Sequence, residues 1–248
     1  MRSRSFSGSN FASSIGPGPL TPAIKILIAL NVGAFLLQQV VGELSIALGL
    51  QPAAVFGQMH VWTPVTYMFL HGGISHILFN MLSLWMFGVE LERMWGTAFF
   101  TRFYLVCGVG AAATTLLLSL LPGELGQGLY ISLTVGASGA IYGILMAYAL
   151  YFPHRQIYMY FIFPVPVRIF VLIVGAISLF SAMGGPGDGV AHATHLGGLA
   201  VGYLYLKGRR LQLGSELQYR LNRWRIDRVR RRFDIHRGGK SDKGPWVH

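Results

Sequence analysis

Six apolar stretches, separated by polar segments or by segments broken with glycine and proline, dominate the pattern of this 248-residue chain. Most approach the ~20 residues that an α-helix needs to cross the hydrocarbon core of a bilayer. We expect one helix in each: Ala23–Val41, His76–Met94, Phe99–Leu121, Ser138–Phe152, Pro166–Ala182 and Ala191–Leu206. The pattern therefore predicts an all-α polytopic membrane protein with six transmembrane helices and no internal repeat.

Two segments depart from simple crossing helices. The first connection, residues 43–75, is apolar but interrupted by proline and glycine, and its Trp62 and Tyr67 are rings of the kind found at membrane interfaces. We expect this first loop to be half-embedded in the membrane surface. The fourth stretch is short for a full crossing, so Ser138 should lie below one surface, where water reaches it through a protein-lined cavity.

Composition agrees with a membrane protein and excludes an ordinary soluble domain. Hydrophobic residues make up 53% of the chain and charged residues 12%, and the mean hydropathy is +0.51. The formal net charge is +11, and 13 of the 20 basic residues lie from Lys207 onward. A basic tail beside a membrane helix meets anionic lipid headgroups more often than nucleic acid, so we expect a lipid partner and no nucleic acid.

The placement of Lys and Arg predicts the orientation in the membrane. Residues 43–75, 122–137 and 183–190 contain no basic residue, whereas the other connections and both ends do. Both termini should then be cytoplasmic and Ser138 should face the opposite side. We expect a disordered N-terminus over 1–20, a six-helix domain over 21–208 and a basic tail over 209–248. The tail is either solvated or an amphipathic helix on the inner leaflet.

A serine opens the fourth apolar stretch, within Gly136-Ala137-Ser138-Gly139. Serine is a good N-terminal capping residue, and the free N–H groups of a first helical turn favour a developing negative charge. Gly136 and Gly139 allow close backbone approach. Small residues of this kind are, on their own, more typical of helix packing than of chemistry.

Histidines on the same side of the membrane add a possible base. His192 and His195 begin the sixth stretch, and the Gly198–Gly202 spacing would let this helix approach the glycine-rich fourth helix. That approach would bring a histidine beside Ser138, although a histidine in a membrane can also be purely structural. Histidine is the usual base that activates a serine.

Further polar residues complete a candidate catalytic site. No acid is available by sequence to orient the base, so Tyr142, one turn below Ser138, is expected to stack on His195. His76 and Asn80 stand one turn apart at the same end of the second helix. Together with the Ser138 N–H they could donate hydrogen bonds to an oxyanion.

Three motifs in this order resemble rhomboid intramembrane serine proteases over nearly all of residues 23–206: His71-Gly-Gly-Ile-Ser-His76-Ile-Leu-Phe-Asn80, Gly136-Ala-Ser138-Gly with Tyr142, and Ala191-His192-Ala-Thr-His195-Leu-Gly-Gly. The resemblance implies the six-helix fold, Ser138 as nucleophile, His195 as base, His76 and Asn80 at the oxyanion, and Tyr142 under the histidine. It also implies a structural Glu92 and cleavage in or near transmembrane segments of single-pass proteins. No cofactor or metal is implied, and the compact core suggests a bacterial cell membrane.

Three other function classes remain to be weighed. A rhomboid-like binding protein without activity would share the fold, but the presence of both Ser138 and His195 argues against it. A metalloprotease or metal transporter could use histidines, yet the chain has no His-Glu-x-x-His and these loops offer almost no carboxylates. A proton-coupled transporter would need acids deep within its spans, which the sequence lacks.

Overall fold

The computed structural model describes residues 16–159, 163–183, 189–210 and 223–224. The chain divides into two units, residues 1–206 and 207–248, and the first contains nearly all of the described structure. Most of the expected N-terminal segment (1–20) and of the expected basic tail (209–248) lies outside the described residues. Their predicted disorder and amphipathic character are therefore not described by the structure.

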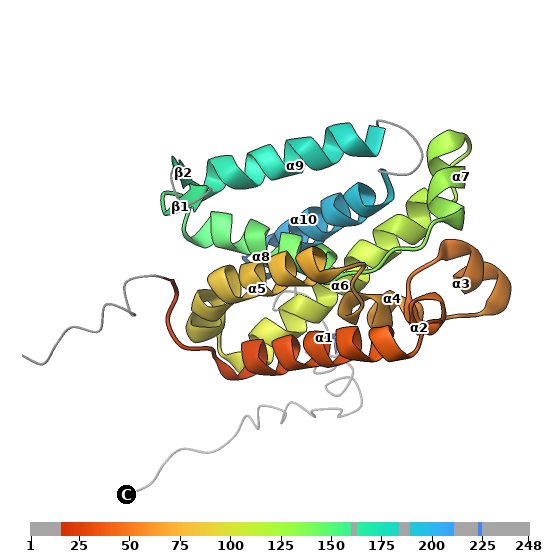
Figure 1. Ribbon diagram of the computed structural model, residues 1–248. Helices are drawn as coiled ribbons and strands as arrows, with labels where there is room; N and C mark the ends of the chain where they lie inside the picture. The colour runs from red at the N-terminus through yellow and green to blue at the C-terminus, as the bar shows by residue number, and fades with distance from the viewer. Residues whose placement is uncertain (1–15, 160–162, 184–188, 211–222, 225–248) are drawn as a thin grey trace, which may run out of the picture. The chain divides into compact units, whose positions relative to one another are not determined.

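The first unit is built mainly from helices (Figure 1). In chain order the elements are α1 (Pro22–Val40), α2 (Leu44–Leu48), α3 (Pro52–Gln58), α4 (Thr63–Thr66), the 3₁₀ turn η2 (Tyr67–Phe69), α5 (Ile74–Trp95), α6 (Thr97–Leu118), α7 (Glu124–Ile131), α8 (Ser138–Tyr151), β1 (Gln156–Met159), β2 (Phe163–Pro166), α9 (Val167–Met183) and α10 (Gly189–Arg210). The six predicted stretches correspond to α1, α5, α6, α8, α9 and α10.

Three of these helices are long and apolar enough to cross a membrane within the described part of the chain: α1, α5 and α6. α8 and residues 167–182 of α9 are apolar but shorter. This mostly helical architecture fits a membrane protein. The count of six crossings stays a prediction.

The all-α expectation is wrong between α8 and α9, where a small antiparallel hairpin pairs Gln156 with Pro166 and Met159 with Phe163. Two prolines in β2 exclude a helix there, because proline lacks the N–H that a helix interior needs. The Ile, Tyr, Phe and Val side chains around them favour extended backbone. Four short helical segments and α7 also occupy stretches that the sequence predicted as irregular connections.

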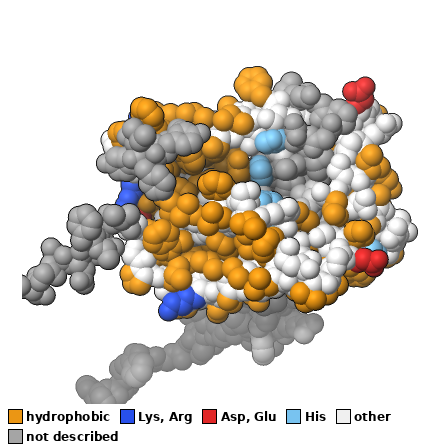
Figure 2. Space-filling view, viewed as in Figure 1, with side chains coloured by type: hydrophobic (Ala, Val, Ile, Leu, Met, Phe, Trp, Pro, Cys, Tyr) orange, Lys and Arg blue, Asp and Glu red, His pale blue; other side chains and the backbone are white. Residues whose placement is uncertain are grey.

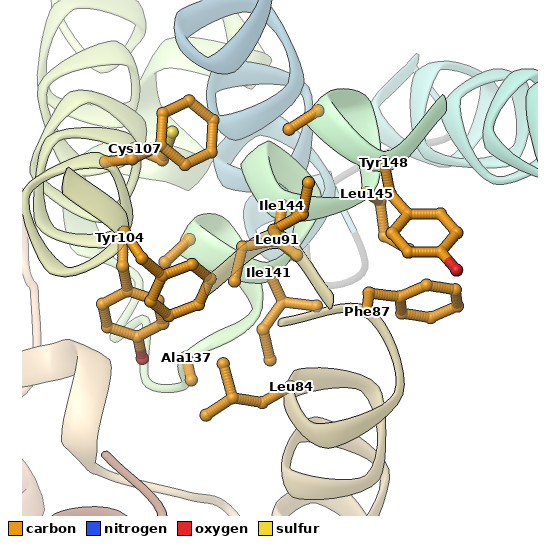
Figure 3. Close-up of a cluster of buried hydrophobic side chains, with 14 of the residues drawn as sticks. Leu84, Phe87, Leu91, Tyr104, Cys107, Ala137, Ile141, Ile144, Leu145 and Tyr148 are labelled. Carbon is orange, nitrogen blue, oxygen red and sulfur yellow. The ribbon is translucent and has the colours of Figure 1, made fainter. Parts of the chain in front are cut away.

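α8 lies at the centre of the packing. It contacts α5, α6 and α9, while α5 in turn contacts α1, so these helices follow one another across the molecule (Figure 1). The large side chains of α8, including Ile141 and Tyr148, meet Leu84, Phe87 and Leu91 of α5 in a buried cluster (Figure 3). The large side chains occupy one side of α8, and its small residues face α6 and α10.

Glu92 ties the start of α1 to the end of α5. Its side chain is 2% exposed and accepts hydrogen bonds from the backbone N–H groups of Ala23 (2.9 Å) and Ile24 (3.2 Å). The hydroxyls of Thr21 and Thr97 also donate to it. Because the first N–H groups of a helix have no partner of their own, this carboxylate caps α1 from a neighbouring helix.

Candidate active site

Ser138 and His195 are hydrogen-bonded to each other across two helices. The Oγ of Ser138, the first residue of α8, lies 2.8 Å from Nε2 of His195 in α10. Both residues are partly exposed. Figure 2 shows several histidine side chains close together near the middle of a face on which hydrophobic side chains are frequent.

Ser138 is the first residue of α8, as predicted, but its side chain does not cap the helix. The N-cap position belongs to Ala137, and no side chain closes that end. The serine hydroxyl is instead engaged with the histidine, which leaves the first-turn N–H groups of α8 free of intrahelical partners. They remain available to stabilise negative charge beside Oγ.

The imidazole of His195 is held by stacking. Its ring lies on the ring of Tyr142, with centroids 4.2 Å apart and planes 7° apart, and the Tyr142 hydroxyl is 3.4 Å from the hydroxyl of Ser178 in α9. Nδ1 of His195 is buried and has no hydrogen-bond partner among the described residues. No carboxylate within the described ranges therefore orients this ring, and the tyrosine does so.

Close backbone contact brings α10 to α8. A Cβ atom added to Gly198 would collide with the carbonyl oxygen of Gly139, and one added to Gly202 would lie 2.9 Å from Cα of Gly143. These glycines let the two backbones touch, as in other small-residue helix contacts. His195 lies almost one turn before Gly198, so this contact sets the distance between the histidine and Ser138.

Gly136 brings a second histidine to the serine. Its φ of +128° lies in a region that residues with a side chain rarely adopt. A Cβ at this position would lie 2.8 Å from Nε2 of His76 and 3.6 Å from Oγ of Ser138. The His76 ring edge therefore faces the turn that presents the serine.

The hydrogen bond to Nδ1 of His76 determines which nitrogen of the neutral ring carries the proton. Nδ1 accepts a hydrogen bond from the N–H of Gly72 at 3.3 Å, so in the neutral ring the proton is on Nε2, the edge that faces Gly136. Asn80 is 6% exposed and donates from Nδ2 to the carbonyl of His76 at 2.9 Å, which leaves its second N–H. Both side chains keep an N–H that can donate a hydrogen bond, and that of His76 faces the turn that presents Ser138.

The first loop holds the chain just before the serine. Leu50 and Thr134 exchange backbone hydrogen bonds of 2.9 and 2.8 Å, and the N–H of Gly136 donates to the carbonyl of Tyr67 at 2.9 Å. The loop itself is anchored where Trp62 Nε1 donates to the carbonyl of Ala47 at 2.9 Å. The position of the serine turn thus depends on residues far away in sequence.

Sequence reasoning missed Thr194 and Thr115, whose hydroxyls share a 2.7 Å hydrogen bond next to His195. Tyr67, expected at the membrane interface, is instead 1% exposed, and its hydroxyl donates to the carbonyl of Gly108 at 2.8 Å. For the two threonines, polar side chains within apolar helices were the available signal. Their partners could not be read from the pattern, because they lie on other helices.

The remaining histidines do not form a metal centre in the described part of the chain. His192 lies with its ring 5.7 Å from that of His195, and the His71 ring lies 5.1 Å from that of His76. No three His, Cys, Asp or Glu side chains among the described residues are grouped to hold a metal ion. Burial, and secondarily the neighbouring His76, lower the pKa of His71 to about 4.

Comparison with known proteins identifies the family. Residues 58–210 match the family model of the Rhomboid domain. The chain belongs to the rhomboid family. Similar proteins include Rhomboid protease GluP of Bacillus subtilis, which is 31% identical over 72% of this chain and 33% of the relative. Rhomboid protein 1, mitochondrial, of Saccharomyces cerevisiae is 34% identical over 55% of this chain and 38% of the relative.

A further rhomboid relative is matched over more of its length. Rhomboid protease GlpG of Pectobacterium atrosepticum is 28% identical over 75% of this chain and 61% of the relative. The chain thus spans between a third and two fifths of GluP and of the yeast protein and under two thirds of GlpG. Membership, together with the apolar helices, establishes a rhomboid-family membrane protein with protease relatives.

Proposed function

We propose that this chain is an intramembrane serine endopeptidase with a Ser138–His195 dyad. The observation that carries the proposal is the 2.8 Å contact between Ser138 Oγ and His195 Nε2 at the free N-terminus of α8. Serine is a weak nucleophile until a base accepts its proton, and a neutral histidine at hydrogen-bond distance is suited to that task.

The geometry suggests the following steps. Ser138 Oγ attacks the carbonyl carbon of the scissile bond while His195 Nε2 takes the hydroxyl proton. The same nitrogen returns this proton to the leaving amine, and water then hydrolyses the acyl-enzyme with His195 again as base. Tyr142, stacked on the ring, keeps Nε2 aimed at the serine without a carboxylate.

The oxyanion of the tetrahedral intermediate needs donors that are in place beforehand. We assign this role to His76 Nε2–H, to the second N–H of Asn80 and to the backbone N–H of Ser138. His76 is suited because Gly72 occupies its other nitrogen and Gly136 leaves room beside it. Each such donor typically contributes ~10²–10³ in rate.

The finer membrane arrangement is also a proposal: six crossings, a half-embedded first loop, cytoplasmic termini and domain limits at residues 21 and 208. The Lys and Arg visible in Figure 2 lie toward one end of that face. This one-sided placement supports the orientation, because the positive-inside rule depends on Lys and Arg. Reporter fusions at Gln127 and His248 test it, since a cytoplasmic signal at Gln127 would contradict it.

The proposed substrates are single-pass membrane proteins cut in or near their transmembrane segments. The two relatives named as rhomboid proteases and the site within an apolar helical domain support this class. A bacterial cell membrane and contact of the basic tail with anionic lipid are part of the same proposal. Mitochondrial relatives also match, so localising the protein in its source cell is the test of which membrane it occupies.

A serine-directed fluorophosphonate probe tests the nucleophile. The purified protein should be labelled, and mass spectrometry should find the label on Ser138. Ser138→Ala and His195→Ala should lose labelling, whereas Ser132→Ala should keep it, because the Ser132 hydroxyl donates to the carbonyl of Gly128 in its own segment. Labelling that persists in Ser138→Ala would refute the proposed nucleophile.

A further inference from the structure

Gln38 is a polar side chain in the last turn of the apolar helix α1, and the structure gives it three hydrogen bonds. Its Nε2 donates to Ser45 Oγ at 2.8 Å and to the carbonyl of His71 at 3.3 Å, and its Oε1 accepts from the N–H of His71 at 3.0 Å. The amide thus binds the His71 residue on both its backbone N–H and C=O. Such complete pairing fixes a loop residue as a neighbouring strand would.

Gln38 holds the backbone of His71, and the next residue, Gly72, donates the hydrogen bond that fixes the tautomer of His76. His71 is 2% exposed, and its ring nitrogens make no hydrogen bond of good geometry with the described residues. The His71 ring packs edge-on against the His76 ring, so the hydrogen bonds that fix this loop residue are those of its backbone to Gln38. The following N–H, that of Gly72, points at Nδ1 of His76.

From these contacts we propose that Gln38 is a positioning residue for the oxyanion donor His76. By clamping the His71 backbone it aims the Gly72 N–H at Nδ1, and this keeps the proton of the neutral His76 ring on Nε2, beside Gly136 and Ser138. The proposal rests on the proposed function for its effect on rate. Its structural part, the tautomer of His76, does not.

Loss of the Gln38 hydrogen bonds should affect the transition state more than the binding of substrate. A neutral histidine exchanges its proton freely between the two nitrogens unless a neighbour occupies one of them. Without the Gly72 hydrogen bond, part of the His76 population would carry its proton on Nδ1 and present an acceptor to the oxyanion. Stabilisation would fall in the transition state more than in the bound substrate, so kcat should fall while KM changes little.

Histidine NMR tests the tautomer directly. The purified protein carrying ¹⁵N-histidine is compared at pH 8, where exposed histidines are neutral, with Gln38→Met, which keeps the side-chain length but loses all three hydrogen bonds. The His76 signals are assigned by their loss in His76→Ala. We expect the Nε2–H form alone in the parent and a mixture of both tautomers in Gln38→Met.

Kinetics on a transmembrane substrate provide the second measurement. Gln38→Met should lower kcat in proportion to the loss of the Nε2–H fraction measured by NMR, about twofold for an equal mixture, with KM unchanged, and Gln39→Met should match the parent. Gln39 is the matched control because it is exposed and donates only to the Phe35 carbonyl of its own helix. The double variant Gln38→Met/His76→Ala should be no slower than His76→Ala, since both changes remove the same donor.

The outcomes separate the possibilities. A pure Nε2–H signal in folded Gln38→Met, or losses that multiply in the double variant, would overturn the positioning role. If Gln38→Met does not fold, Gln38→Glu carries the same test, because it keeps the acceptor for the His71 N–H and loses both donor bonds. If the parent cleaves nothing, the proposed function fails, while the NMR comparison still decides whether Gln38 sets His76.

Discussion

Replacing Gly198 by alanine should weaken both the fold and the proposed catalysis. The added Cβ would strike the carbonyl oxygen of Gly139, which belongs to the backbone and cannot rotate away. α10 must therefore move off α8, and His195, almost one turn earlier on the same helix, moves with it. The contact between Gly198 and Gly139 therefore affects both the packing of the helices and the position of the proposed base.

The size of the effect can be worked from the contacts. Gly202→Ala would place a Cβ 2.9 Å from Cα and 3.0 Å from O of Gly143, so the helices would have to separate by a few tenths of an ångström. Gly198→Ala requires a larger separation of the helices, because its Cβ would collide with the carbonyl oxygen of Gly139. Overpacking of this kind costs about 1–3 kcal/mol. The 2.8 Å Ser138–His195 hydrogen bond would lengthen beyond good geometry, and a ~1 Å displacement costs ~100-fold in rate.

The assay combines stability and cleavage in detergent micelles. Unfolding free energies and kcat/KM on a transmembrane substrate are measured for Gly198→Ala, Gly202→Ala and Gly33→Ala. Gly33 lies in α1 with nothing within 4 Å of an added Cβ, so its variant should behave like the parent. We expect the order of loss Gly198→Ala, then Gly202→Ala. A Gly198→Ala protein as stable and active as Gly33→Ala would refute the reasoning.

Other predictions address the neighbouring residues. Glu92→Ala should lower the unfolding free energy by about 3 kcal/mol, measured by chemical unfolding, because two buried backbone N–H groups lose their acceptor. The depressed pKa of His71 means that the unfolded chain binds its proton first, so stability should fall as pH drops from 6.5 towards about 4, and His71→Gln should flatten this slope. Asn80→Ala should retain residual cleavage in a kinetic assay, since other donors remain. His192→Ala should be milder than His195→Ala, and a dead His192→Ala beside an active His195→Ala would reverse the assignment of the base.

The apolar pattern predicted the long elements well because lipid imposes a simple rule on them. Helices that cross a membrane must be long and apolar, so α1, α5 and α6 begin and end within a few residues of the predicted limits. The connections obey no such rule. Proline and glycine in residues 43–75 mark short helices and turns, and the prolines of 163–166 belong to a strand.

The site was predictable where chemistry restricts the residue type. Ser138 and His195 stood out because polar residues are costly in an apolar helix. The orientation of each side chain depended on contacts between distant segments, which the sequence does not reveal. The Ser138 hydroxyl bonds to a histidine in place of capping α8, and Gln38 reaches His71 across 33 positions of sequence.

Cleavage by the purified protein tests the central claim most directly. A transmembrane substrate is incubated in micelles with the parent, Ser138→Ala, His195→Ala and the double variant. The parent should cut it, each single variant should be inactive, and the double variant should be no worse, because the two residues act as a unit. A purified Ser138→Ala protein that still cuts the substrate would contradict the account.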